Sequence, residues 1–192
     1  MDNPTFDYKA RWSRAAALME RDGVDALFLM KPANLAYFTG DGRPCALALL
    51  TRTQRCVVAV PACDVASVQR ASAATEIRAF QSEAEMFHGF RDVLQELGLT
   101  QATIAIEKNF FDAALYDVFV AHILPQAKVV PATPIISQLR MIKDPEEIAC
   151  LKAAARVAAA GMSAAARTLR SGVSEAEIAG EAELPMRKPG AE

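Results

Sequence analysis

The segment VDALFLM, from Val24 to Met30, is a short apolar run between Gly23 and a turn-rich stretch at residues 32–42. A run of this length and composition is typical of a buried strand. Residues 7–22, just before it, carry apolar side chains at helical spacing, and Gly23 is placed to end that helix. The chain therefore opens with a helix that leads into a buried strand.

The alternation of helices and strands continues to residue 130. Two apolar runs, 46–50 and 56–60, are joined by the polar segment 51–55, which predicts an antiparallel hairpin. Further strands are predicted at 77–80, 103–106 and 128–130, and further helices at 62–73, 82–97 and 112–124. We therefore expect an α/β fold, with helices flanking a mixed sheet of about six strands.

The composition changes after Pro134, and two helix starts follow. Asp144 can cap a helix whose first residue is Pro145, and Ser174 with Glu177 forms a second capping box. The first of these helices should reach Gly172 and the second about Met186. The first has an apolar stripe made of Ile148, Leu151, Ala155, Ala158, Met162, Ala166 and Leu169. Such a stripe needs a packing partner, so we divide the chain into a domain at 1–133 and a linker with the first helices of a second domain at 134–192.

Three segments resemble the creatinase/prolidase family. They are Asn34–Gly40 (NLAYFTG), Leu139–Ile148 (LRMIKDPEEI) and Gly172–Ala179 (GVSEAEIA). Their order and spacing match that family along the whole chain. The resemblance implies a creatinase-type N-terminal domain, followed by a long helix pair from the start of a pita-bread catalytic domain that is truncated early.

The same resemblance implies the function of the intact protein. Family members are usually dimers in which one N-terminal domain borders the active site of the other subunit. Many are Xaa-Pro dipeptidases or aminopeptidases that use two divalent metal ions (Mn, Co or Zn). Their metal ligands lie further along than this sequence reaches, so we expect no catalytic residue and no metal site here, and an inactive chain. The alternatives are a non-catalytic protein- or peptide-binding module and part of a creatinase-like C–N hydrolase.

Arg43, in Gly42-Arg43-Pro44, is the candidate substrate-binding residue. Creatinases carry a similar G-R-P, and the resemblance implies that this arginine reaches toward substrate. A planar guanidinium suits a carboxylate, as a peptide or a small carboxylate substrate would offer. The alternative is an arginine that is solvated or tied to a carbonyl group. Asp41 stands where creatinases have an aromatic residue, which speaks against creatine itself.

The remaining polar candidates have local explanations and are not expected to be catalytic. Asn34 and Tyr37 should shape the turn after the first strand, and Arg140 and Lys143 should pair at the domain junction. His88 and His122 should be partly buried at the core edge, and Asp64 and Glu107 need no special role. The expectation for these residues is therefore structural.

The composition excludes several classes of function. A net charge of −2 does not favour nucleic acid as a partner. The sequence has no run of about 20 apolar residues, so no membrane span is predicted. Residues 1–9 do not resemble a secretory signal. The segment Gly40-Asp41-Gly42 is only the beginning of a dinucleotide-binding motif. We expect a cytoplasmic protein whose cysteines, Cys45, Cys56, Cys63 and Cys150, are free and mostly buried.

Overall fold

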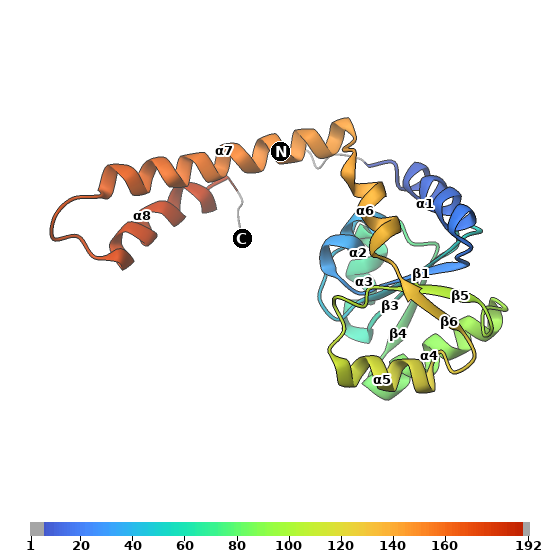
Figure 1. Ribbon diagram of the computed structural model, residues 1–192. Coiled ribbons are helices and arrows are strands. Elements are labelled where there is room, and N and C mark those ends of the chain that lie inside the picture. Colours follow the sequence, from blue (N-terminus) through green and yellow to red (C-terminus); the bar gives the residue numbers. More distant parts are fainter. Residues whose placement is uncertain (1–5, 190–192) are drawn as a thin grey trace. The chain divides into compact units, whose positions relative to one another are not determined.

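The computed structural model describes residues 6–189, which form two compact units (Figure 1). The first unit spans Phe6–Ile142, and the second begins at Lys143. The first unit is an α/β domain built on one sheet, and the second is a pair of helices.

The sheet of the first unit has six strands in the order β4-β3-β2-β1-β5-β6. The strands are β1 (Ala26–Leu29), β2 (Leu47–Thr51), β3 (Cys56–Pro61), β4 (Glu76–Phe80), β5 (Thr103–Ile106) and β6 (Lys128–Pro131). β2 is antiparallel to both β1 and β3, whereas the pairs β1–β5, β3–β4 and β5–β6 are parallel. The predicted hairpin and the predicted mixed six-stranded sheet are therefore confirmed.

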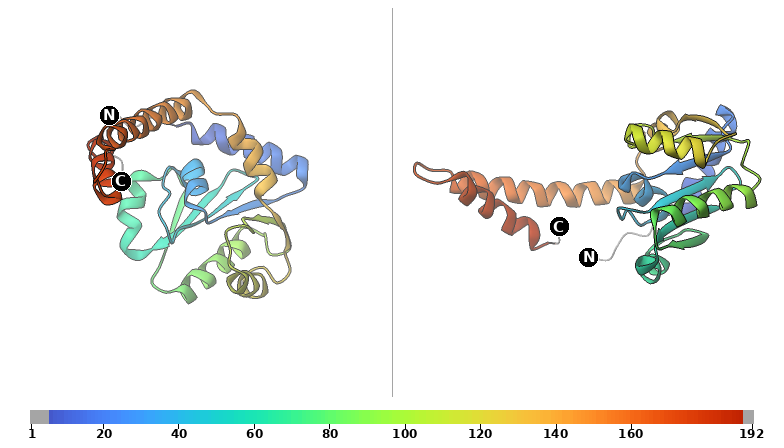
Figure 2. Two further views of the ribbon diagram at one scale, coloured as in Figure 1. Left: turned by 60° about the vertical axis from the view of Figure 1, so that its left-hand side comes forward. Right: turned by 90° about the horizontal axis from the view of Figure 1, so that it is seen from below.

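The alternation of side chains along each strand divides the core into two layers. Leu27 and Leu29 of β1 belong to one apolar cluster, and Ala26 and Phe28 belong to the other. The first cluster includes residues of α1 (Tyr8–Asp22), α2 (Pro32–Thr39), α3 (Val65–Ala71) and α6 (Thr133–Met141). The second includes residues of α4 (Glu83–Glu96) and α5 (Ala113–His122). Helices thus cover both faces of the sheet, as Figure 2 shows.

The turn-rich stretch at residues 32–42 was predicted wrongly, because most of it is the helix α2. Pro32 stands in its first turn, and Gly40 ends it in the left-handed conformation, with φ 86°. Leu35 and Phe38 are buried against the first face of the sheet. The packing of these side chains, together with an anchor described below, stabilises a helix whose N-cap, Lys31, provides no side-chain hydrogen bond.

A second correction concerns residues 134–142, which the sequence suggested as linker. They lie in α6, whose Ile135, Ile136 and Leu139 are buried in the first core cluster. A short 3₁₀ turn, Ala62–Asp64, also precedes α3, so the helix expected at 62–73 is divided. The apolar residues of α6 are spaced for a helix that packs on a domain core, and this element belongs to the first unit.

The second unit consists of α7 (Pro145–Thr168) and α8 (Glu175–Arg187). Both predicted capping boxes are present, Asp144 with Glu147 and Ser174 with Glu177. α7 ends at Thr168 rather than near Gly172. Close packing of the pair depends on Gly161, because a Cβ atom there would lie 2.6 Å from the sulfur of Met186.

The predicted stripe of α7 does not form the contact with α8. Gly161 and Ala164 are the buried residues of α7, whereas Met162 and Leu169 are 72% and 71% exposed. α7 therefore presents small residues to α8 and leaves the larger apolar side chains of the stripe uncovered.

Among residues 6–189, α7 alone is long and apolar enough to cross a membrane, judged by length and composition. From the sequence, no membrane span was predicted for this helix. Its apolar character comes largely from alanine, and Lys152 and Arg156 interrupt it. A helix of this kind is equally typical of packing inside a soluble domain, so the observation is weak evidence for a membrane.

The cysteines differ from the prediction. All are free, as expected, but only Cys56 is buried, and Cys45, Cys63 and Cys150 are exposed. Cys56 is the first residue of the central strand β3, so packing on both sides removes it from water. Burial raises the pKa of the Cys56 thiol to about 12.

Replacing Phe28 with alanine should be severely destabilising. The ring lies between those of Phe90 and Phe119, with centroid distances of 5.0 and 4.6 Å. We expect the free energy of unfolding in urea to fall by about 3–5 kcal/mol, the usual cost of deleting a buried phenylalanine side chain. Phe110→Ala is the matched control, because Phe110 is 44% exposed and its loss should change stability little. Equal losses for both variants would contradict the assignment of Phe28 to the core.

The thiols should separate into two classes in a titration with a chromogenic disulfide at pH 8. Since only the thiolate reacts, the exposed Cys45, Cys63 and Cys150 should react in the folded chain, and Cys56 only as the chain unfolds. A Cys56→Ser chain should lose the slow phase alone. Fast reaction of all four thiols in a chain with an unchanged melting curve would be inconsistent with this burial.

Candidate functional site

Several loops meet at one edge of the sheet. β1 runs toward residue 30, and the antiparallel β2 begins at the same edge, after residues 40–46. β3 ends there at residues 61–64, and β5, which is parallel to β1, ends there at Glu107. Open α/β sheets bind ligands beyond the carboxyl ends of their parallel strands, so this edge is the candidate functional site. Residues 40–46 are called the Arg43 loop.

Arg43 is held by side chains of its own loop and of the segment after β3. Its Nε lies 3.1 and 3.0 Å from the two carboxylate oxygens of Asp41, and one terminal nitrogen lies 2.6 Å from Asp41 Oδ2. The same terminal nitrogen donates to Ser67 Oγ at 2.6 Å, and the other lies 3.2 Å from Asp64 Oδ1. Every nitrogen of the guanidinium therefore has at least one partner.

These contacts define the electrostatics of the loop. The side chain of Arg43 is 19% exposed, that of Asp41 12%, and that of Asp64 37%. Hydrogen bonds to Asp41 are the main cause of a raised pKa of Arg43, and partial desolvation opposes them. The arginine is thus neither a solvated loop residue nor tied to a carbonyl group. Asp64, which was expected to have no role, is one of its partners.

Two glycines allow the Arg43 loop to lie against its neighbours. A Cβ atom on Gly42 would lie 2.7 Å from the carbonyl oxygen of Pro32 and 3.0 Å from the Cβ of Ala36. At Gly40 the backbone is left-handed, and a Cβ atom would lie 2.8 Å from Tyr8 Oη. Cys45 has a positive φ of 65°, which is uncommon for a non-glycine residue. The loop is therefore held close to α1 and α2.

Glu107 is buried at the end of β5 and anchors the start of α2. Its Oε2 accepts hydrogen bonds from the backbone nitrogens of Met30, at 2.6 Å, and of Lys31, at 2.7 Å. Its Oε1 accepts a hydrogen bond from the side-chain amide of Asn34. The expectation that Glu107 has no special role is wrong, because from the neighbouring strand it holds the turn that leads into α2 and the side chain of Asn34 in the first turn of that helix.

Asn34, Arg140 and Tyr37 extend this network toward α6. Arg140 donates to Asn34 Oδ1, so Asn34 connects Arg140 with Glu107. The hydroxyl of Tyr37 donates to the carbonyl oxygen of Leu139 at 3.3 Å and accepts from Arg14 at 3.4 Å. These residues fix α2 relative to α6, and the contacts that engage them are internal to the fold.

The histidines are placed differently from the prediction. His88 in α4 and His122 at the end of α5 are both exposed rather than partly buried. Each lies beside the apolar residues of its helix in sequence but outside the face that packs on the sheet. Across residues 6–189, no three His, Cys, Asp or Glu side chains gather closely enough to hold a metal ion.

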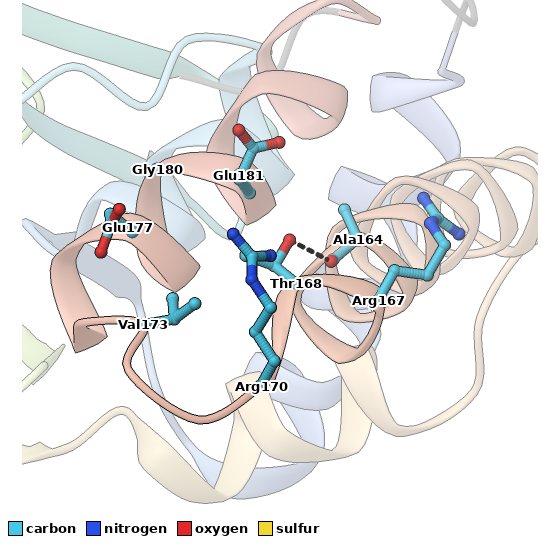
Figure 3. A pocket seen from close by; sticks show the side chains of 8 residues that line it. All are labelled: Ala164, Arg167, Thr168, Arg170, Val173, Glu177, Gly180 and Glu181. Atoms are coloured by element: carbon cyan, nitrogen blue, oxygen red, sulfur yellow. Dashed lines mark hydrogen bonds between the residues drawn. The ribbon is translucent and has the colours of Figure 1, made fainter.

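The second unit has an open hollow of about 570 Å³ between the end of α7 and α8 (Figure 3). Its lining includes Arg167, Arg170, Glu177 and Glu181, and the side chain of Arg170 extends across its middle. Glu177 is engaged by the capping box, and the hydrogen bonds that it accepts from Ser174 lower its pKa. The hollow is thus a polar surface of the helix pair, without a buried charged group directed into it.

The fold agrees with the comparisons with known proteins. A family model described as the creatinase/prolidase N-terminal domain matches residues 11–142. The chain belongs to the creatinase/prolidase family. The resemblance noted in the sequence is therefore confirmed, and the matched segment ends where the first unit ends.

Individual creatinase/prolidase relatives match both units of the chain. The Xaa-Pro dipeptidase of Pyrococcus furiosus is 23% identical over 184 residues, which are 96% of this chain and 50% of that protein. The structure of an Xaa-Pro dipeptidase from Bacillus anthracis superposes with a TM-score of 0.82 at 22% identity, covering 96% of this chain and 50% of that one. The chain spans about half the length of the curated relatives that it matches.

A third creatinase/prolidase relative is matched over nearly its whole length. An Xaa-Pro aminopeptidase chain from Streptococcus thermophilus has 98% of its residues covered by 70% of this chain, with a TM-score of 0.58 and 20% identity. The fold of about 70% of this chain is therefore shared with nearly all of a shorter chain in a solved structure.

Replacing Glu107 with glutamine should weaken the anchor of α2. The carboxylate accepts from three donors, which belong to Met30, Lys31 and Asn34. In glutamine an NH₂ group replaces one of the accepting oxygens, so at least one of these donors would lose its acceptor. We expect the free energy of unfolding in urea to fall by about 1–3 kcal/mol, the cost of a buried unsatisfied donor. Glu83→Gln, on the exposed first turn of α4, is the control and should change stability by less than about 0.5 kcal/mol. An unchanged stability of the Glu107 variant would refute the anchoring role.

Proposed function

We propose that this chain provides the N-terminal domain and the first catalytic-domain helices of a metal-dependent Xaa-Pro dipeptidase or aminopeptidase. The observation that carries the proposal is the superposition on an Xaa-Pro dipeptidase across 96% of the chain, which includes both units. The match to the Xaa-Pro dipeptidase of Pyrococcus furiosus over 96% of the chain supports the same reaction class. In this proposal the first unit, Phe6–Ile142, is the N-terminal domain, and the helices α7 and α8 that follow it are the opening of a pita-bread domain.

The residues described here do not fit the metal ions that the proposal requires. Two divalent ions (Mn, Co or Zn) need a set of carboxylate and histidine ligands, and no such group forms among residues 6–189. We assign the ligands to the half of the relatives that lies outside the match. The role of this chain is then to shape the substrate pocket and the dimer, and hydrolysis is not one of its own activities.

The uncovered stripe of α7 supports the assignment of the second unit. Leu151, Met162 and Leu169 are exposed, although leucine and methionine side chains of a helix usually pack on a core. The relatives are about twice as long as the matched region, and their unmatched half could supply the residues of such a core. We propose that this stripe packs inside the catalytic domain.

The Arg43 loop is the part of the first unit that we assign to the active site of the intact enzyme. We propose a homodimer in which this loop, at the carboxyl edge of the sheet, borders the active site of the other subunit and faces a peptide substrate. Glycines at 40 and 42 and the ion pairs of Arg43 keep the loop in one conformation, as the wall of a pocket requires. Three exposed free thiols suit the reducing cytoplasm as its location.

The test is to assay the purified chain for metal binding and hydrolysis. Calorimetric titration with Mn²⁺, Co²⁺ and Zn²⁺ should give no tight stoichiometric binding, and alanyl-proline should not be cleaved in their presence. Limited proteolysis should then cut within 143–189 and leave 6–142 intact, because the helix pair buries little apolar surface.

Two outcomes would count against the proposal. Tight metal binding or prolyl dipeptide hydrolysis by this chain, with contaminating peptidase excluded, would mean that it is an enzyme by itself. Complete protection of residues 143–189 would favour the alternative of a binding module whose helices are already packed. Met162→Glu is a useful companion variant and should leave the melting temperature unchanged, whereas Leu139→Glu in the core should lower it strongly.

A further inference from the structure

The ion pairs of Arg43 have a consequence for the substrate. One guanidinium faces two carboxylates, so the cluster of Asp41, Arg43 and Asp64 has a formal charge of −1. A third carboxylate that approaches Arg43 would meet this negative charge, and it would find the arginine's nitrogens already engaged. To form a bidentate contact with the guanidinium it would have to displace at least one of these partners, and the partner held in bidentate geometry is the mostly buried Asp41.

Asp41 is the partner that determines this state. It contacts both Nε and a terminal nitrogen of Arg43, and its Oδ1 also accepts a hydrogen bond from the backbone nitrogen of Arg43 at 3.1 Å. Its side chain is 12% exposed, so little water competes for these bonds. Asp64 contacts a single nitrogen and is three times as exposed, at 37%. Asp41 therefore holds the guanidinium, and Asp64 adds to the negative charge.

We propose that Asp41 is a specificity-determining residue that masks Arg43 against carboxylates. Resting on the proposed function, the pocket wall then disfavours a free carboxylate, such as the C-terminus of a dipeptide or a small carboxylate substrate. It favours a peptide whose chain continues past the wall as a neutral amide. Arg43 is in consequence a positioning residue that connects its loop to Ser67 of α3, rather than a receptor for an anion.

The masking can be measured on the 192-residue chain without any catalytic activity. Phenylglyoxal modifies accessible guanidinium groups, and mass spectrometry of the digested chain gives the rate at each arginine. The probes are N-acetylglycine, which carries a carboxylate like a peptide C-terminus, and N-acetylglycinamide, which is its neutral counterpart. Arg21 is the reference, because it pairs with Asp22 at the surface and its side chain is 53% exposed.

In the wild-type chain, Arg43 should react roughly tenfold more slowly than Arg21, as expected for a charge-assisted bidentate pair of low exposure, and neither probe should change its rate. In the Asp41→Asn chain, Arg43 should react faster, and N-acetylglycine but not N-acetylglycinamide should slow the reaction. Asp22→Asn is the matched control, since it removes the same charge from a surface pair and should affect Arg21 alone. Thermal melting followed by circular dichroism establishes that each variant is folded.

The wild-type measurement decides the proposal even if a variant does not fold. Protection of wild-type Arg43 by N-acetylglycine, or a rate equal to that of Arg21, would overturn the masking. A folded Asp41→Asn chain whose Arg43 stays unprotected would show that Asp41 is not the determinant. These outcomes are separate from those of the metal and hydrolysis assays, so the masking and the proposed function can fail independently.

Discussion

The buried carboxylate of Glu107 is the interaction on which the candidate site depends. It lies at the end of β5 and accepts hydrogen bonds from the backbone where β1 passes into α2, and from the side chain of Asn34. Without it, the backbone N–H groups of Met30 and Lys31 and the side-chain amide of Asn34 would lose their acceptor. The side chain of Glu107 thereby connects the neighbouring strands β1 and β5 with the helix α2, which leads to the Arg43 loop. Through Asn34 and Arg140 it is also connected with the helix α6.

The position of the Arg43 loop follows from this anchor in two steps. α2 is fixed at its first turn by Glu107, and its last turn ends at Gly40, whose left-handed backbone directs the chain toward β2. Gly42 then allows the loop to approach the carbonyl oxygen of Pro32 closely. The ion pairs of Arg43 with Asp41 and Asp64 connect the loop to the segment after β3. The geometry at the sheet edge is thus determined by contacts between segments that are distant in sequence.

This dependence explains which features could be predicted from the sequence. Most of the strands are short apolar runs with clear ends, and the helices α7 and α8 begin with capping boxes whose partners are three residues apart, so local rules suffice for both. The helix α2 was missed because the turn before it and its Asn34 are held by Glu107, more than 70 residues later. The same limit applies to Asp64, because only the folded sheet brings it to Arg43. The exposure of His88 and His122 also depends on the rotation of each helix about its axis, which spacing defines only within one or two residues.

The fold and the charge at the sheet edge depend on different parts of the sequence. At 22% identity the chain still superposes on a dipeptidase with a TM-score of 0.82, because the apolar pattern that builds the sheet tolerates many sequences. The chemistry at the sheet edge depends on far fewer side chains, and a single carboxylate next to an arginine changes the charge that a substrate meets from +1 to 0. With Asp64 the charge becomes negative, so in the proposed masking the loop disfavours a free carboxylate and favours a neutral amide. Under the proposed function, the family fold provides the architecture of the pocket wall, and the proposed masking by Asp41 sets its selectivity.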